Sequence, residues 1–135
     1  MSTGADEDMG PLFSEEPIGQ QLAFYQSQAQ TRVILGGNRI GKTSAGGRET
    51  AWWMDGSHPY RDVPPAGAKG WIITETREIA NEIILPKLMY YLPKSGPGAV
   101  ERFDPGNDTR PASIVTKNTS RLLIRTYAQR RQRFQ

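Results

Sequence analysis

Residues 31–43 read TRVILGGNRIGKT, and this stretch decides the fold. Its first half is a short β-branched run ended by paired glycines, which is typical of a buried parallel strand. Residues 36–43 match the pattern G-x-x-x-x-G-K-[ST] at every defined position. Residues 42–54 (KTSAGGRETAWWM) are predicted to form a helix, so the pattern lies where a strand gives way to a helix. This is the setting in which such a loop binds phosphate groups.

The spacing of this motif suits a loop that wraps around a polyphosphate. Glycines let the backbone curl tightly without Cβ clashes, so that several N–H groups point inward. The following helix adds unpaired amides and the positive end of its dipole. Lys42 is expected to contact the β- and γ-phosphates, and the Thr43 hydroxyl to ligate Mg²⁺. The residues predicted to bind ATP here are Gly36, Gly37, Asn38, Arg39, Ile40, Gly41, Lys42, Thr43 and Ser44.

An arginine inside the loop is the unusual feature of this motif. A guanidinium beside the phosphates would sense or neutralise the charge of the γ-phosphate, which makes Arg39 a candidate catalytic residue together with Lys42. The alternative is a surface arginine held by a nearby carboxylate. The sequence leaves both roles of Arg39 open.

The segment before the motif offers groups that recognise a base. Residues 18–30 (IGQQLAFYQSQAQ) are predicted to form a short helix. A purine needs an edge to hydrogen-bond and a flat surface to lie on. We expect Gln21 to read the adenine edge and Tyr25 to stack on the ring. The alternative is that these side chains only pack the helix against its neighbours.

The rest of the chain favours an α/β fold. Pro86 lies within a predicted helix and removes the amide hydrogen bond to Glu82, so the helix is expected to kink or end there. The order βαβα followed by a hairpin predicts an incomplete P-loop NTPase-type three-layer sandwich with a mainly parallel sheet. The predicted elements after residue 54 are a loop at 55–70, a strand at 70–75, a helix at 76–93, a loop at 94–112 and a hairpin at 113–127.

Composition and charge describe a single loop-rich domain. The chain has 135 residues, of which 36% are hydrophobic and 23% charged, and this balance argues against disorder. Residues 1–17 are acidic and are expected to form a flexible lead-in to a P-loop ATPase part at 18–135. The last fifteen residues carry five arginines and no acid, which suits an anionic partner such as nucleic acid. A solvated surface is the plainer alternative.

Several classes of protein are excluded by the composition. The chain has no cysteine, and therefore neither a disulfide framework nor a thiolate metal site. The start MSTGADEDMG does not resemble a signal peptide, and no apolar run approaches the ~18 residues of a membrane span. We therefore expect a cytoplasmic protein without membrane contact. His58, the single histidine, precedes Pro59 and is expected to be a turn element, with a general base as the alternative.

The residues around the motif also resemble a known family. GGNRIGKT at 36–43, preceded by QQLAFYQSQAQTRVIL and followed by TSAGGRETAWWMDGSHPY, resembles the large subunit of phage terminases. SRLLIRTYAQRRQRFQ at 120–135 resembles a later segment of that family, with an apolar strand, a Tyr-x-Gln turn and a basic stretch ending in Phe-Gln. The resemblance covers about residues 18–135.

The resemblance implies an ATP-driven motor that moves double-stranded DNA into a procapsid in the cytoplasm of a bacterial host. By position, it implies that residues 36–43 bind ATP–Mg²⁺, that Lys42 contacts phosphate and that Gln21 contacts adenine. The implied partners are double-stranded DNA, the portal and the small terminase subunit. The complete relatives are expected to form a homo-oligomeric ring and to cut DNA with a separate nuclease domain.

The chain departs from the family in its acidic residues. Hydrolysis needs an acid that holds Mg²⁺ and a carboxylate that activates water, usually at the end of an apolar strand in Asp-Glu. The family has this strand shortly after Phe-Gln, whereas the sequence stops at Gln135, and Glu75 is expected to follow a non-catalytic strand. We therefore expect a fragment that binds ATP with little or no hydrolysis. A small P-loop kinase and a catalytically dead nucleotide-binding remnant are the alternatives.

Overall fold

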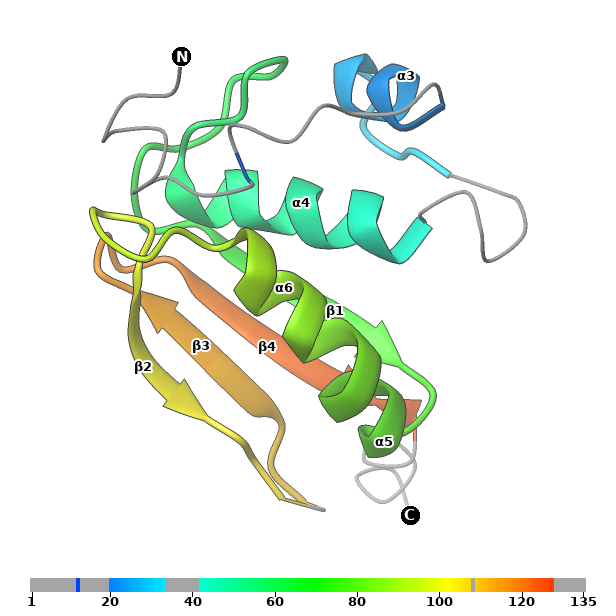
Figure 1. The fold of residues 1–135 in the computed structure, drawn as a ribbon, viewed down its shortest axis with the longest axis vertical. Coiled ribbons are helices and arrows are strands. Elements are labelled where there is room, and N and C mark those ends of the chain that lie inside the picture. Colours follow the sequence, from blue (N-terminus) through cyan, green and yellow to red (C-terminus); the bar gives the residue numbers. More distant parts are fainter. Residues whose placement is uncertain (1–11, 13–19, 34–41, 108, 128–135) are drawn as a thin grey trace.

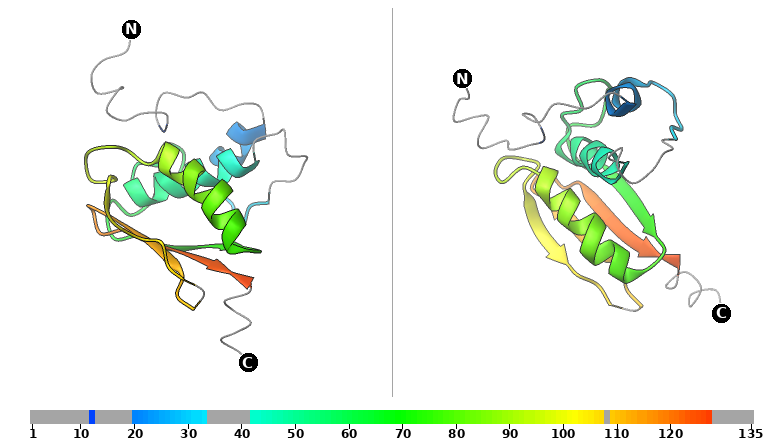
Figure 2. Two further views of the ribbon diagram at one scale, coloured as in Figure 1. Left: turned by 60° about the horizontal axis from the view of Figure 1, so that its bottom comes forward. Right: turned by 45° about the vertical axis from the view of Figure 1, so that its right-hand side comes forward.

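The computed structural model describes Leu12 and residues 20–33, 42–107 and 109–127. A four-stranded sheet lies in one layer, and the helices cover one of its faces (Figures 1 and 2). The helices are α3 (Gln20–Gln26), α4 (Lys42–Asp55), α5 (Arg77–Ile79), the π-helix η2 (Ala80–Ile84) and α6 (Leu85–Tyr91). The strands are β1 (Lys69–Thr74), β2 (Val100–Asp104), β3 (Ala112–Thr116) and β4 (Arg121–Thr126).

The strand order is β1-β4-β3-β2, in which β1 pairs with β4 in parallel and the other two pairs are antiparallel. The α/β class is as predicted, but the described sheet is mixed rather than mainly parallel. The difference comes from β2, which falls in the Gly- and Pro-rich stretch 94–112 that was predicted to be a loop. A short connection joins β2 to β3, and short connections allow only antiparallel pairing. The strand predicted before the motif lies largely outside the described residues.

The core lies between the sheet and the helices. Side chains alternate along β4, so that Leu122 and Ile124 are buried while Leu123 and Arg125 lie on the opposite face, as the predicted hairpin requires. Ile114 of β3 and Leu88 of α6 are both fully buried against them. Burying one such side chain contributes about 1.5–3 kcal/mol. The described helices therefore hold one face of the sheet and leave the other to solvent.

The helical segment around Pro86 neither ends nor breaks. Thr76 caps its start, because the Thr76 hydroxyl accepts the backbone N–H of Ile79 at 3.1 Å. Residues 80–84 then form a π-turn in which the N–H of Leu85 donates to the carbonyl of Ala80, five residues back. Pro86 follows in the first turn of α6, where a missing N–H is tolerated. The helical segment therefore continues through Pro86, so of the two predicted outcomes an end of the helix is excluded.

The C-terminal end of α4 is fastened to the turn between β3 and β4. Gly56 has φ +78°, and its N–H donates to the carbonyl of Trp52 at 2.9 Å, as in a left-handed helix cap. The side-chain amide of Asn118 donates to the carbonyls of Met54 at 2.9 Å and Pro65 at 3.1 Å. The turn of the predicted hairpin is therefore hydrogen-bonded to the C-terminal end of α4.

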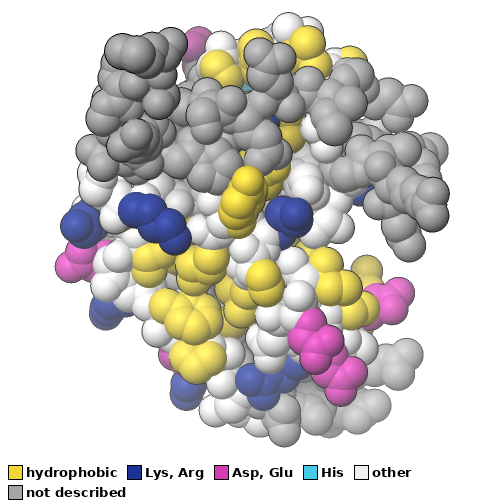
Figure 3. Space-filling view, in the orientation of Figure 1, with side chains coloured by type: hydrophobic (Ala, Val, Ile, Leu, Met, Phe, Trp, Pro, Cys, Tyr) yellow, Lys and Arg dark blue, Asp and Glu magenta, His cyan; other side chains and the backbone are white. Residues whose placement is uncertain are grey.

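The helix-bearing face of the molecule carries mixed charge. Its visible part shows hydrophobic side chains among lysines and arginines, with acidic side chains toward the lower right (Figure 3).

Gly47 of α4 faces α6 rather than the sheet, since a Cβ there would lie 3.2 Å from Cγ of Lys87. In the part of the chain that the structure describes, no helix is long and apolar enough to cross a membrane.

Candidate functional site

Helix α4 begins at Lys42, inside the sequence motif. Lys42, Thr43 and Ser44 form its first turn and are half-buried. The first amides of an α-helix have no partner within the helix and carry the positive end of its dipole. The helix predicted over 42–54 is thus confirmed, with one further residue at its end. The predictions for Gly36, Gly37, Asn38, Arg39, Ile40 and Gly41 lie outside the described residues.

An ion pair ties the chain that leads into the motif to the helix that leaves it. Nη2 of Arg32 lies 2.6 Å from Oε2 of Glu49, and Nη1 of Arg32 donates to Oε1 at 3.2 Å. The same guanidinium lies over the ring of Phe24 and donates to its carbonyl. Glu49 is seven residues after Lys42, or about two helical turns, so both lie on one side of α4. The ion pair therefore holds the segment that precedes the motif against the side of α4 that carries Lys42.

Glu49 is the centre of a buried hydrogen-bond network. Besides Arg32, Nε1 of Trp53 and Nε2 of His58 each lie 2.8 Å from a Glu49 oxygen. Burial by itself raises the pKa of Glu49, but the hydrogen bonds from His58, Arg32 and Trp53 together lower the pKa from 4.5 to about 2. Glu49 is therefore an ionised acceptor at neutral pH and a poor proton acceptor for catalysis.

The hydrogen bonds of His58 assign it a structural role. The backbone N–H of Tyr60 donates to Nδ1 at 3.1 Å, so the ring proton resides on Nε2 and points to Glu49. His58 is only 7% exposed and lies against the ring of Trp52 at 4.9 Å between centroids. This arrangement favours the predicted turn element over a general base.

The residues predicted to hold adenine are buried. Tyr25 is 1% exposed, and its ring meets Trp52 edge-on at 4.8 Å between centroids. The guanidinium of Arg48 lies 4.8 Å above the Trp52 ring and donates to the carbonyl of Leu12 at 3.0 Å. Gln21 is 7% exposed. Tyr25 has no open ring face for a base in this conformation, which favours the packing alternative for this helix.

Two acids outside this network are Glu75 and Asp104. Glu75 follows the last residue of β1 and is exposed. Asp104 accepts the backbone N–H of Gly106 and a hydrogen bond from Arg110, and both lower its pKa. Within the described ranges, no cluster of three or more His, Cys, Asp or Glu could hold a metal ion. Thr43 thus remains the predicted Mg²⁺ ligand.

Sequence reasoning missed the contribution of Arg32 and Glu49. The one available signal was the seven-residue spacing between Lys42 and Glu49, which places both on one helix side. Nothing in the sequence pairs Arg32 with a residue seventeen positions later.

No protein-family model, curated protein or solved structure matches the chain. The resemblance to terminases therefore rests on the motif, its flanking residues and residues 120–135.

Proposed function

We propose that residues 36–43 and the first turn of α4 bind ATP with Mg²⁺. The observation that carries this proposal is that Lys42 and Thr43, the last two residues of a complete G-x-x-x-x-G-K-[ST] pattern, lie in the helix α4. The Arg32–Glu49 ion pair supports it, because it restrains the chain on the other side of the motif. Restraining both ends of a loop lowers the conformational entropy that ligand binding must remove.

Each group of the chain has a separate role in this proposed site. The free amides at the start of α4 face the phosphates, and Lys42 adds a charge-assisted contact. The Thr43 hydroxyl would hold Mg²⁺, and Arg39 would supply a second positive charge for the γ-phosphate. Glu49 does not act as the base, because its oxygens already accept hydrogen bonds from Arg32, Trp53 and His58.

We further propose, on the resemblance alone, that the chain is the ATP-binding portion of a terminase-like motor. ATP binding would then serve the translocation of double-stranded DNA in a cytoplasmic ring, with the portal and the small terminase subunit as partners. A P-loop kinase and a nucleotide-binding remnant are the competing proposals. Transfer of label from γ-labelled ATP to a mixture of nucleosides and sugars would select the kinase.

The nucleotide site is tested by Lys42→Ala in the full chain, with a fluorescent ATP analogue as the ligand. Losing a charge-assisted contact to phosphate should weaken binding about tenfold to a hundredfold. Lys94→Ala is the matched control, because Lys94 is an exposed lysine outside the motif. Thr43→Ala should remove the gain in affinity that Mg²⁺ gives to the unaltered chain. Equal affinity of Lys42→Ala and the control would refute the site.

A further inference from the structure

The outer face of β1 and β4 lies opposite the helix layer (Figure 2). Parallel register places Lys69 beside Arg121, Trp71 beside Leu123, and Ile73 beside Arg125 on this face. Trp71 is 64% exposed and Ile73 is 46% exposed, although both are large apolar residues of β1. A large exposed aromatic ring on an uncovered sheet indicates a binding surface.

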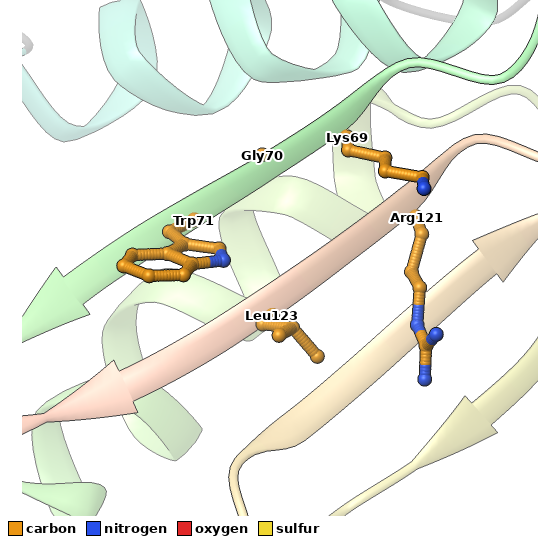
Figure 4. Close-up of a pocket in the computed structure, with 5 residues that line it drawn as sticks. All are labelled: Lys69, Gly70, Trp71, Arg121 and Leu123. Atoms are coloured by element: carbon orange, nitrogen blue, oxygen red, sulfur yellow. The ribbon is translucent and has the colours of Figure 1, made fainter.

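A recess of about 450 Å³ lies on this face and is lined by Lys69, Gly70, Trp71, Arg121 and Leu123. The side chains of Lys69 and Arg121 lie at one end, the indole of Trp71 lies at the other, and Leu123 lies between them (Figure 4). The guanidinium of Arg125 is 4.7 Å from the centre of the Trp71 ring. Arg121 and Arg125 are four strand residues, or about 13 Å, apart. Arg125 therefore covers one face of the Trp71 ring, and Lys69 and Arg121 lie at the far end of the recess.

The cations of this face outnumber its acids within the described part of the chain. Asp104 lies on the same face, in register with Ser113, which is in register with Leu123, but its carboxylate is paired with Arg110. Lys69 lies directly opposite Arg121, and like charges in this position destabilise a sheet. Arg102 of β2 extends the same row, because it is in register with Val115, which is in register with Arg121. Among the described residues, no acid forms an ion pair with these three cations or with Arg125. An anionic ligand would relieve this repulsion.

We propose that this face binds single-stranded nucleic acid, with one base stacked on Trp71. The phosphates on the two sides of that base contact the Lys69–Arg121 pair and Arg125. Stacking on an exposed ring requires a base whose face is free, which a single strand offers and a duplex does not. A second recess joins Lys69, Trp71 and Arg121 to Glu49 and Trp53 of α4, so this face borders that helix at the edge of the sheet. Among the described residues, neither Lys42 nor Thr43 lines either recess, and the strand site is therefore separate from the ATP site proposed at Lys42.

The test measures binding of a labelled oligothymidylate to the full chain by fluorescence anisotropy, beside a duplex of equal length. Trp71→Ala should weaken binding of the single strand about fivefold to a hundredfold, while Trp71→Phe should keep most of the affinity. Both variants should fold, because Trp71 is largely exposed. Lys42→Ala should bind the oligonucleotide like the unaltered chain, so a failed ATP site and a failed strand site give different results.

The salt dependence supplies the second measurement. Removing Lys69 and Arg121 together should reduce the slope of log affinity against log salt by about 0.7, since the pair contacts one phosphate and each phosphate neutralised on a single strand contributes about 0.7. The control is the double variant Lys94→Ala, Lys117→Ala, which removes two exposed lysines elsewhere. Equal binding of duplex and single strand, unaffected by Trp71→Ala, would overturn the proposal. So would a complete lack of binding, or a Trp71→Ala variant that changes only self-association.

Discussion

Replacing Glu49 by Gln tests the ion-pair network that holds the candidate site. The two Glu49 oxygens accept four N–H groups, from Arg32 twice, from Trp53 and from His58. A glutamine has the same shape but only one acceptor oxygen. Its NH₂ group would face the N–H donors that the second carboxylate oxygen of Glu49 accepts. The loss of a buried charge partner for Arg32 is expected to lower the free energy of unfolding at pH 7 by about 3 kcal/mol.

The magnitude also follows from the pKa of Glu49. This pKa is lowered from 4.5 to about 2 in the folded protein, where burial opposes the shift and hydrogen bonds from His58, Arg32 and Trp53 exceed it. A lowered pKa stabilises the folded state fully above about pH 4.5, and this stabilisation is lost as the pH falls toward 2. The full contribution is about 2–3 kcal/mol, of which about 2 kcal/mol should be lost between pH 7 and pH 3.

Urea denaturation followed by tryptophan fluorescence measures both effects. Glu49→Gln cannot lose a proton in this range, so the gap in stability between it and the unaltered chain should narrow by about 2 kcal/mol from pH 7 to pH 3. Glu101→Gln is the matched control, since Glu101 is exposed on β2, and it should stay within about 0.5 kcal/mol of the unaltered chain. A gap of the same size at both pH values would refute the reasoning.

Three further predictions concern α4, two of them at its C-terminal end. Asn118→Ala should lower the free energy of unfolding by about 2–3 kcal/mol, because it leaves the carbonyls of Met54 and Pro65 without their donor; an unchanged melting temperature would contradict this. Gly56→Ala should cost about 1–3 kcal/mol, since φ is +78° and the added Cβ would lie 2.6 Å from the carbonyl oxygen of Pro65. Gly46→Ala should instead stabilise by about 0.5–1 kcal/mol in the same urea assay, because nothing lies within 4 Å of its Cβ position.

Local patterns predicted the elements whose signals are contained in a few neighbouring residues. The helix at 42–54 and the hairpin at 113–127 are both present, because helical composition and strand alternation act within one segment. The strand β2 was missed, because its five residues stand among glycines and prolines and form a bulged edge strand whose only partner is β3. The sequence also left the structure around Pro86 open. A π-turn and the end of a helix can each accommodate a residue without an N–H, and the structure contains the π-turn.

The candidate site was predictable only in part. The helix over Lys42–Asp55 was predicted from the motif, because a pattern of this kind is typically followed by a helix. The placement of Tyr25 did not follow, because an aromatic residue ahead of the motif is equally suited to stacking on a base and to filling a core. The burial of Tyr25 against Trp52 decides for the core in this structure.

The sequence by itself determined the α/β class, the position of the phosphate-loop pattern and the helix that leaves it, because these depend on spacing along the chain. Only the tertiary structure paired Arg32 with Glu49, since two charges seventeen residues apart meet only after α4 has packed. Only the register of β1 with β4 places Lys69, Trp71 and Arg121 around the same recess. Long-range contacts of this kind depend on how the elements are arranged in space, which no local pattern encodes.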